Sequence, residues 1–223
     1  MKEVLWFCVT ALLGYLLGSI NTGIIVSKVL MHGDVRKHGS GSAGMTNMLR
    51  TYGKKAAVLT ALGDVLKGVL AVWLGQWLFA QMLPVPAQWG GYLAYVFAVI
   101  GHWKPVFFGF KGGKCILVSA GGLLAIEPAL VGLLGCIFLL FFLPTRMVSA
   151  GSIAMGASFP IVTALYGHFV MRLQGTELKL LVAVTAFIGA LVLYLHRANI
   201  KRILNGTEYR FDGKKKKEAD NQE

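Results

Sequence analysis

The sequence predicts an all-α integral membrane protein with about seven transmembrane helices. Of the 223 residues, 56% are hydrophobic and only 14% are charged, whereas soluble domains usually carry about 25% charged residues. The apolar residues are grouped in long, nearly uncharged runs, and most basic residues fall between alternate runs. This composition excludes intrinsic disorder, a disulfide scaffold and a large soluble catalytic domain.

Seven apolar segments follow one another along the chain. The first begins after Met1-Lys2-Glu3 like a signal peptide, but it lacks a clear small-residue cleavage site and continues through Ile25. We therefore expect it to remain as a transmembrane helix. The fourth is short, and Glu127-Pro128 separates it from the fifth, so these are two helices or one broken helix. The segments are 4–26, 56–83, 87–103, 115–126, 128–143, 147–171 and 180–195.

The basic residues predict the orientation in the membrane. With seven spans, 18 of the 22 Lys and Arg residues face one side, and basic residues accumulate on the cytoplasmic side. The N-terminus is then outside and the C-terminus cytoplasmic, in a bacterial cell membrane. Six spans would place the basic tail outside, which the same rule disfavours. The net charge of +12 thus reports topology and gives no indication of nucleic-acid binding.

The chain divides into a membrane domain, 1–205, and a polar tail, 206–223. The tail contains Lys214–Lys217, which we expect near anionic lipid headgroups. The three cysteines show no CxxC spacing and indicate neither a disulfide framework nor a zinc site. No His, Cys or carboxylate cluster has metal-ligand spacing, so we expect no metal and no cofactor. The oligomeric state is not indicated, and the sequence is compatible with a monomer.

The first polar cluster, Asp34–Arg50, has the composition of an anion-binding loop. Its glycines fit G-x-G-x-x-G, but no strand precedes them, so a dinucleotide fold is excluded. Glycine amides can still approach an anion, and a helix beginning near Met45 would direct its positive end toward it. Hydroxyls and a guanidinium add donors; the alternative is an ordinary basic loop. The residues concerned are Gly39, Ser40, Gly41, Gly44, Thr46 and Arg50.

The second and third clusters fall on the same predicted side. Gly101–Lys114 is not a Walker A loop, because Cys115 replaces the required Ser or Thr. Its end, Lys111-Gly112-Gly113-Lys114, remains suitable for a phosphate; the alternative is a flexible topogenic loop. The third cluster, His196–Glu208, follows the last span. His196 and Asn199 share a helical face there, and the alternative is a helix end anchored by basic residues.

Other features narrow the chemistry. Asp64 and Lys67 lie three residues apart in an apolar segment and predict an ion pair, which could also help to organise the site. Ser152 begins the sixth segment and is either a helix cap or a ligand donor. The G-x-S-x-G elbow and the His-x4-Asp acyltransferase arrangement are both missing. The chemistry that remains is that of a cytoplasmic site rich in hydrogen-bond donors suited to phosphate and poor in obvious bases or nucleophiles.

Taken together, the clusters resemble the bacterial acyl-phosphate-dependent glycerol-3-phosphate acyltransferases, the PlsY family. The matching pieces occur in the family's order and span nearly the whole chain. They are Gly18–Gly23, Asp34–Arg50, Gly101–Lys114 and His196–Glu208.

The resemblance implies transfer of a fatty acyl group from acyl phosphate to the 1-hydroxyl of glycerol 3-phosphate, in contact with membrane lipids. It implies that Ser40, Thr46 and Lys114, with nearby glycine amides, hold a phosphate. It further implies that Arg50, Ser152, His196 and Asn199 orient glycerol 3-phosphate. The remaining positions assigned to substrate binding by the match are Gly39, Gly41, Gly44, Gly112, Gly113 and Glu208.

The chain departs from the family pattern at four positions. Asn21 stands where proline is usual, Ser42 where asparagine is usual, and Met45 where alanine is usual. Cys115 replaces the glycine that normally follows Gly-Gly-Lys. These departures leave open a diverged paralogue with another acyl acceptor. An anion transporter and a non-catalytic scaffold that docks headgroups are further alternatives.

Overall fold

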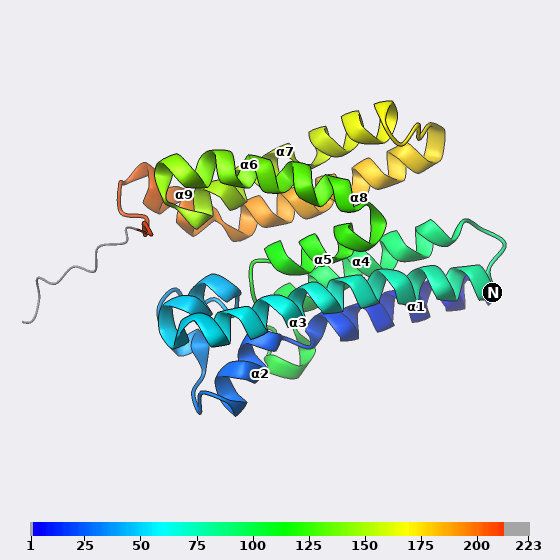
Figure 1. Ribbon diagram of the computed structural model, residues 1–223. Helices are drawn as coiled ribbons and strands as arrows, with labels where there is room; N and C mark the ends of the chain where they lie inside the picture. The colour runs from blue at the N-terminus through cyan, green and yellow to red at the C-terminus, as the bar shows by residue number, and fades with distance from the viewer. Residues whose placement is uncertain (1, 212–223) are drawn as a thin grey trace, which may run out of the picture.

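The computed structural model describes residues 2–211 and contains helices but no strand in that range (Figure 1). The expected all-α class is therefore confirmed. Lys214–Lys217 and the rest of the predicted tail beyond 211 lie outside the described residues. In chain order the elements are α1 (Lys2–Ser19), α2 (Thr22–Val29), η1 (Val35–Lys37), α3 (Met45–Met82), α4 (Ala87–Trp103), η2 (Val106–Phe108), α5 (Ile116–Ile126), α6 (Pro128–Thr145), α7 (Val148–Phe169), α8 (Gly175–Leu195) and α9 (Arg197–Leu204).

Five stretches of the described chain are long and apolar enough to cross a membrane. They are Lys2–Val29, Met45–Met82, Pro128–Thr145, Val148–Phe169 and Gly175–Leu195. Two further apolar helices, α4 with 17 residues and α5 with 11, are shorter than the roughly 20 residues of an upright crossing. The multi-span character is thus supported, while the count of seven and the orientation stay predictions.

The first apolar run, expected as one span over 4–26, contains a helix break. α1 ends at Ser19 and α2 begins at Thr22. Between them Asn21 has extended backbone angles, and its side-chain oxygen accepts the N–H of Ile24 at 3.3 Å. Asparagine at this position therefore starts a new helix as its N-cap.

α3 begins well before the predicted segment 56–83. Its backbone is interrupted at Gly53, where φ is +84°, a conformation that glycine adopts at little cost. The turns before Gly53 form a short helix of their own, and this piece carries Thr46 and Arg50. The long membrane helix follows it.

The open question about the fourth and fifth segments is resolved in favour of two helices. Glu127 has extended backbone angles, and its carboxylate accepts the N–H of Ala129 at 3.3 Å. Pro128 occupies the first helical position of α6, where its missing N–H costs nothing. The sequence pair Glu127-Pro128 thus ends α5 and starts α6.

Glycines allow the helices to approach closely. A Cβ on Gly18 of α1 would collide with the carbonyl of Ala98 in α4, and Gly75 of α3 and Gly90 of α4 exclude each other's Cβ in the same way. Small residues are the usual means of helix contact in a membrane, because lipid tails give little hydrophobic drive for association.

The helices form two groups that lie side by side, α1–α5 and α6–α9 (Figure 1). An apolar cluster joins the groups and includes Tyr95 of α4, Leu134 of α6, Phe159 of α7 and Ile188 of α8. The loop that precedes α3, the loop that precedes α5 and the segment after α8 meet at one end of the bundle. The predicted polar clusters are therefore brought together.

Candidate active site

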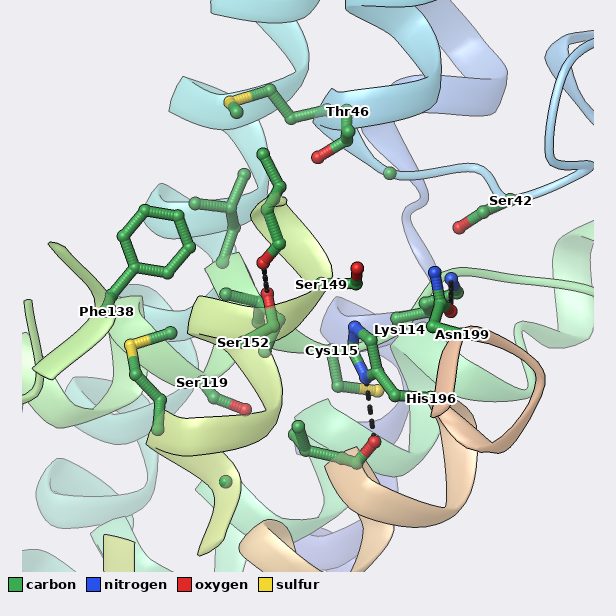
Figure 2. Close-up of a pocket in the computed structure, with 18 of the residues that line it drawn as sticks. Ser42, Thr46, Lys114, Cys115, Ser119, Phe138, Ser149, Ser152, His196 and Asn199 are labelled. Atoms are coloured by element: carbon green, nitrogen blue, oxygen red, sulfur yellow. Dashed lines mark hydrogen bonds between the residues drawn. The ribbon is translucent and has the colours of Figure 1, made fainter. Parts of the chain in front are cut away.

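A cavity of about 740 Å³ lies between the two helix groups at this end. Its polar lining comes from both groups, and its remaining wall is formed by apolar side chains of α5 to α8, such as Leu123, Phe138 and Phe159. Figure 2 shows the polar side chains around the same space, with Thr46 pointing in from the first group and Ser152, His196 and Asn199 from the second.

The first polar loop is shaped by Asn47, a buried residue of α3 that sequence analysis did not single out. Its side-chain amide donates to the carbonyls of Val35, His38 and Ser42 at 2.9–3.1 Å. Its oxygen accepts the N–H of Ser40 at 2.9 Å. One asparagine thus folds the loop onto the start of the helix.

The glycines of this loop have different roles. Gly39 and Gly41 have φ values of +57° and +70°, in the left-handed region that favours glycine. Gly44 precedes α3, and its carbonyl accepts the N–H groups of Asn47 and Met48 at 3.1 Å, which leaves the first two amides of the helix, Met45 and Thr46, without a partner within it. Gly39 and Gly44 line the cavity, together with Ser40, Ser42, Met45, Thr46 and Arg50, whereas Gly41 does not.

The second loop uses its glycine amides for internal contacts. Gly112 N–H donates to the carbonyl of Trp103 and Gly113 N–H to that of His102, each at 3.2 Å. A Cβ on either glycine would collide with His102, with its carbonyl at Gly112 and its ring at Gly113. Neither glycine lines the cavity. Their amides therefore fix the segment that carries Lys114 to the end of α4 and are not available to an anion.

Lys114 begins a hydrogen-bonded chain that crosses between the helix groups. Its ammonium donates to Asn199 Oδ1 at 2.5 Å, and Asn199 Nδ2 donates to Glu208 Oε1 at 2.7 Å. Glu208 also accepts from Ser149 Oγ at 2.8 Å and from Arg202 Nε at 2.7 Å. The carboxylate therefore fixes the side chains that orient Lys114.

The surroundings shift the pKa values of Lys114 and Glu208, the charged groups at the two ends of this series of hydrogen bonds. Burial, and then the neighbouring charge of Arg202, lowers the pKa of Lys114 to about 8. Burial raises the pKa of Glu208, but hydrogen bonds from Asn199, Ser149 and Arg202 outweigh it and hold the pKa below the usual range. Near neutral pH, Glu208 is therefore an anion and Lys114 a cation close to its titration point.

His196 is a neutral hydrogen-bonding group. Its Nδ1 lies 2.8 Å from the carbonyl of Val192, which can only accept, so Nδ1 carries the proton. Burial lowers the pKa of His196 to about 4. Nε2 is then left as an acceptor, in a side chain that lines the cavity (Figure 2).

Ser152 and Cys115 complete the lining. Ser152 is not a helix cap: it lies in the second turn of α7, and its hydroxyl donates to the carbonyl of Val148 at 2.9 Å. Cys115 is buried with φ at +69°, and its thiol donates to the carbonyl of Val99 at 3.5 Å. Cys115 thus replaces the glycine of the family pattern at a position whose backbone conformation favours glycine.

The predicted ion pair lies beside the cavity. Lys67 Nζ is 2.8 Å from Asp64 Oδ1. The same ammonium donates to the carbonyl of Ile20 at 3.0 Å and contacts His102 Nδ1 at 2.8 Å. Asp64 and His102 line the cavity. The pair thus connects the α1–α2 break to the residue that supports the second loop.

Most of the predicted site residues meet in one place. Ten of the thirteen line the cavity: Gly39, Ser40, Gly44, Thr46, Arg50, Lys114, Ser152, His196, Asn199 and Glu208. The other three, Gly41, Gly112 and Gly113, do not line the cavity and instead determine the conformation of the two loops. Sequence reasoning missed Asn47, Ser149, Arg202 and Tyr209. Arg202 and Tyr209 lie within or directly after the third cluster, which is the only signal that could have indicated them.

The chain matches a family model described as glycerol-3-phosphate acyltransferase over residues 8–206. It is 41% identical over 213 residues to a glycerol-3-phosphate acyltransferase of Clostridioides difficile, covering 96% of this chain and 99% of that protein. It is 42% identical over 197 residues to the enzyme so named in Bacillus subtilis, covering 88% of this chain and 93% of that protein.

Solved structures show the same fold. A crystal structure of PlsY, an integral membrane glycerol 3-phosphate acyltransferase, in its glycerol 3-phosphate form has a TM-score of 0.79 and 34% identity, covering 92% of this chain and 96% of that one. The lysophosphatidic acid form has a TM-score of 0.76 and 33% identity, covering 92% and 95%.

Proposed function

We propose a reaction for this protein on the basis that the chain belongs to the glycerol-3-phosphate acyltransferase family. It is a membrane acyltransferase of phospholipid synthesis that acts on glycerol 3-phosphate. The donor we propose is acyl phosphate, and the acceptor atom is the 1-hydroxyl oxygen. The products are then lysophosphatidic acid and inorganic phosphate.

One observation carries this proposal. The same cavity is lined by two sets of groups that can donate hydrogen bonds to a phosphate and, along its remaining wall, by apolar side chains. A substrate with a phosphate at one end of a fatty chain fits such a cavity along its length. The second set of donors accommodates a second, smaller phosphate ester. Both substrates are thereby held close together, which removes much of the entropic barrier to their reaction.

The residues divide between the two substrates. The hydroxyls of Ser40 and Thr46, the amides of Met45 and Thr46 at the start of α3, and the ammonium of Lys114 hold the phosphate of the donor. On the other side, Arg50, Ser152, His196 and Asn199 orient glycerol 3-phosphate. Arg50 supplies a planar fork that suits bidentate phosphate contact.

The chemical step needs no covalent enzyme intermediate. The 1-hydroxyl oxygen attacks the acyl carbonyl carbon and forms the ester bond. The bond between that carbon and the phosphate oxygen then breaks, and phosphate leaves with the electron pair. A phosphate oxygen of a substrate takes the hydroxyl proton. Lys114 and the fixed amides stabilise the charge that develops on the leaving group.

His196 has a binding role in this scheme. Its Nε2, kept as an acceptor by the hydrogen bond from Nδ1 to Val192, can receive a hydroxyl of the glycerol backbone. A pKa of about 4 makes it a weak proton acceptor at neutral pH. The substrate phosphate is therefore the better base.

We propose that the cavity faces the cytoplasm. Lys114, Arg50 and the other basic residues of the three polar clusters lie at the cavity end of the bundle, which the positive-inside rule assigns to the cytoplasm. The localisation that follows is a bacterial cell membrane. Labelling of single introduced cysteines from each side of a sealed vesicle tests this orientation.

The test of the reaction uses purified protein, palmitoyl phosphate and labelled glycerol 3-phosphate. We expect labelled lysophosphatidic acid without acyl-CoA, ATP or added metal. Arg50→Ala and Lys114→Ala will each reduce the rate at least tenfold, because each removes a charged phosphate contact. Lys54→Ala, an exposed lysine outside the cavity, is the matched control. Full activity in the first two variants would refute the site assignment.

The same assay separates the alternatives. A paralogue with another acceptor would release phosphate from palmitoyl phosphate with a different alcohol but form no lysophosphatidic acid. An anion transporter would give counterflow in proteoliposomes without product. The cavity does not favour transport, because all of its charged lining except Asp64 comes from the three polar clusters and its remaining wall is apolar.

A further inference from the structure

The chain after α9 returns over the cavity and places an aromatic ring against Arg50. The guanidinium carbon of Arg50 lies 4.0 Å from the centre of the Tyr209 ring. Phe211 contacts that ring edge-on, with ring centres 5.1 Å apart, and its N–H donates to the carbonyl of Arg146 at 2.8 Å. Tyr209 is thus held from the second helix group, whereas Arg50 belongs to the first.

The stack is the contact that restrains the Arg50 side chain. Arg50 is exposed, and its guanidinium forms no hydrogen bond or ion pair with any residue in the described range 2–211. An arginine side chain has about 2 kcal/mol of rotamer entropy to lose when it is fixed. A ring centred 4.0 Å from the guanidinium carbon limits this freedom before substrate arrives.

The N–H donors of Arg50 remain available to a phosphate, because none of them is bonded to a residue in the described range. A guanidinium is planar, and its N–H donors lie in the plane, so a ring on its face does not compete with a phosphate at its edge. We propose that Tyr209 is a positioning residue for the acceptor phosphate: it fixes the plane of Arg50 so that the fork faces the phosphate of glycerol 3-phosphate. This rests on the proposed role of Arg50.

The chain offers a matched control for this contact. Tyr194 stacks on Arg197 with the guanidinium carbon 4.2 Å from the ring centre. Neither residue lines the cavity. Removing that ring removes a comparable arginine–tyrosine contact, together with an edge-on contact to Trp103 at 6.2 Å between ring centres, and leaves every residue that lines the proposed phosphate site in place.

The test compares Tyr209→Leu, Tyr209→Phe and Tyr194→Leu. Stacks at exposed sites contribute about 0.5–1 kcal/mol, which corresponds to a twofold to fivefold change. We expect Tyr209→Leu to raise KM for glycerol 3-phosphate by about that factor, with kcat and KM for palmitoyl phosphate unchanged. Tyr209→Phe keeps the ring and restores KM, and Tyr194→Leu leaves it unchanged. In an Arg50→Ala background, which removes the cation that the ring contacts, Tyr209→Leu has no further effect.

Several results would overturn the inference. These are an unchanged or lowered KM in Tyr209→Leu, a loss in Tyr209→Phe equal to that in Tyr209→Leu, or the same loss in Tyr194→Leu. Binding of glycerol 3-phosphate, followed by the thermal shift of each variant without donor, gives a readout that does not need turnover. A wild type that binds but makes no product would refute the proposed function, while weaker binding in Tyr209→Leu would still support the role of Tyr209.

Discussion

Replacing Lys67 with methionine will leave Asp64 as a buried carboxylate without its cation. Their charged atoms lie 2.8 Å apart, and the two side chains are 6% and 1% exposed. Methionine is similar in length to the lysine stem, so the substitution removes the charge with little change in packing. It also leaves the carbonyl of Ile20 without the donor that now lies 3.0 Å away.

The two losses can be separated. Breaking one side of a buried ion pair costs about 3–5 kcal/mol, and an unpaired carbonyl costs about 1–3 kcal/mol. His102 Nδ1 lies 3.7 Å from Asp64 Oδ1, but it accepts the hydrogen bond from the Lys67 ammonium, so it has no proton to offer the carboxylate and does not compensate for the loss. The double variant Asp64→Asn/Lys67→Met removes the isolated charge and keeps only the second loss. We therefore expect it to be more stable than Lys67→Met by about 3–5 kcal/mol.

The measurement is unfolding of the purified protein in mixed micelles by titration with denaturing detergent, followed by tryptophan fluorescence. Lys54→Met removes an exposed lysine of the same helix and controls for the loss of charge alone. Equal stability of the single and double variants would show that the isolated carboxylate is not the cause. A Lys67→Met protein as stable as the wild type would refute the reasoning altogether.

Three further predictions concern the cavity. Because burial lowers the pKa of Lys114 to about 8, kcat/KM for glycerol 3-phosphate will fall as pH rises through about 8 and the ammonium loses its proton; Lys114→Arg will remove this alkaline fall, and a wild-type profile without it would contradict the assignment. Cys115→Val will lose stability in the same micelle titration, because a β-branched residue fits poorly at φ +69°, whereas Cys115→Gly will stay within about 1 kcal/mol of the wild type since relief of backbone strain offsets the lost thiol; equal tolerance of both would refute this. Gly135 lines the cavity with open space before it, so Gly135→Leu will raise KM for palmitoyl phosphate more than for octanoyl phosphate, whereas Gly132→Leu, equally open but outside the cavity, will not; equal effects on both donors would show that the chain does not pass Gly135.

The sequence was sufficient to predict which polar residues meet at the cavity, because each cluster is local in the chain. Ser40, Thr46 and Arg50 follow glycines at a helix start, and His196 and Asn199 share one helical turn. Each cluster lies next to an apolar run, so the membrane restricts where it can be. Their meeting at one end of the bundle follows from the alternation of spans.

The supporting contacts could not be predicted in the same way. Ser149 and Glu208 are far apart in the chain, and no spacing rule relates a serine of one helix to a carboxylate beyond another. Asn47 resembles any polar residue in a helix start, and only the folded loop shows its four hydrogen bonds. The amides of Gly112 and Gly113 were expected at an anion, but tertiary contacts with the end of α4 use them first.

The division of the site between two helix groups ties its chemistry to their packing. Lys114 belongs to the first group, and the side chain that orients it, Asn199, belongs to the second. Arg50 and Tyr209 are divided in the same way. If the groups separated, Lys114 would regain water and its pKa would return toward the ordinary value, while Asn199 and Glu208 would keep their mutual bond. The Lys114 ammonium therefore has a pKa close to neutral pH, and a fixed position beside the other phosphate-binding groups, only when the apolar faces of the two helix groups are in contact.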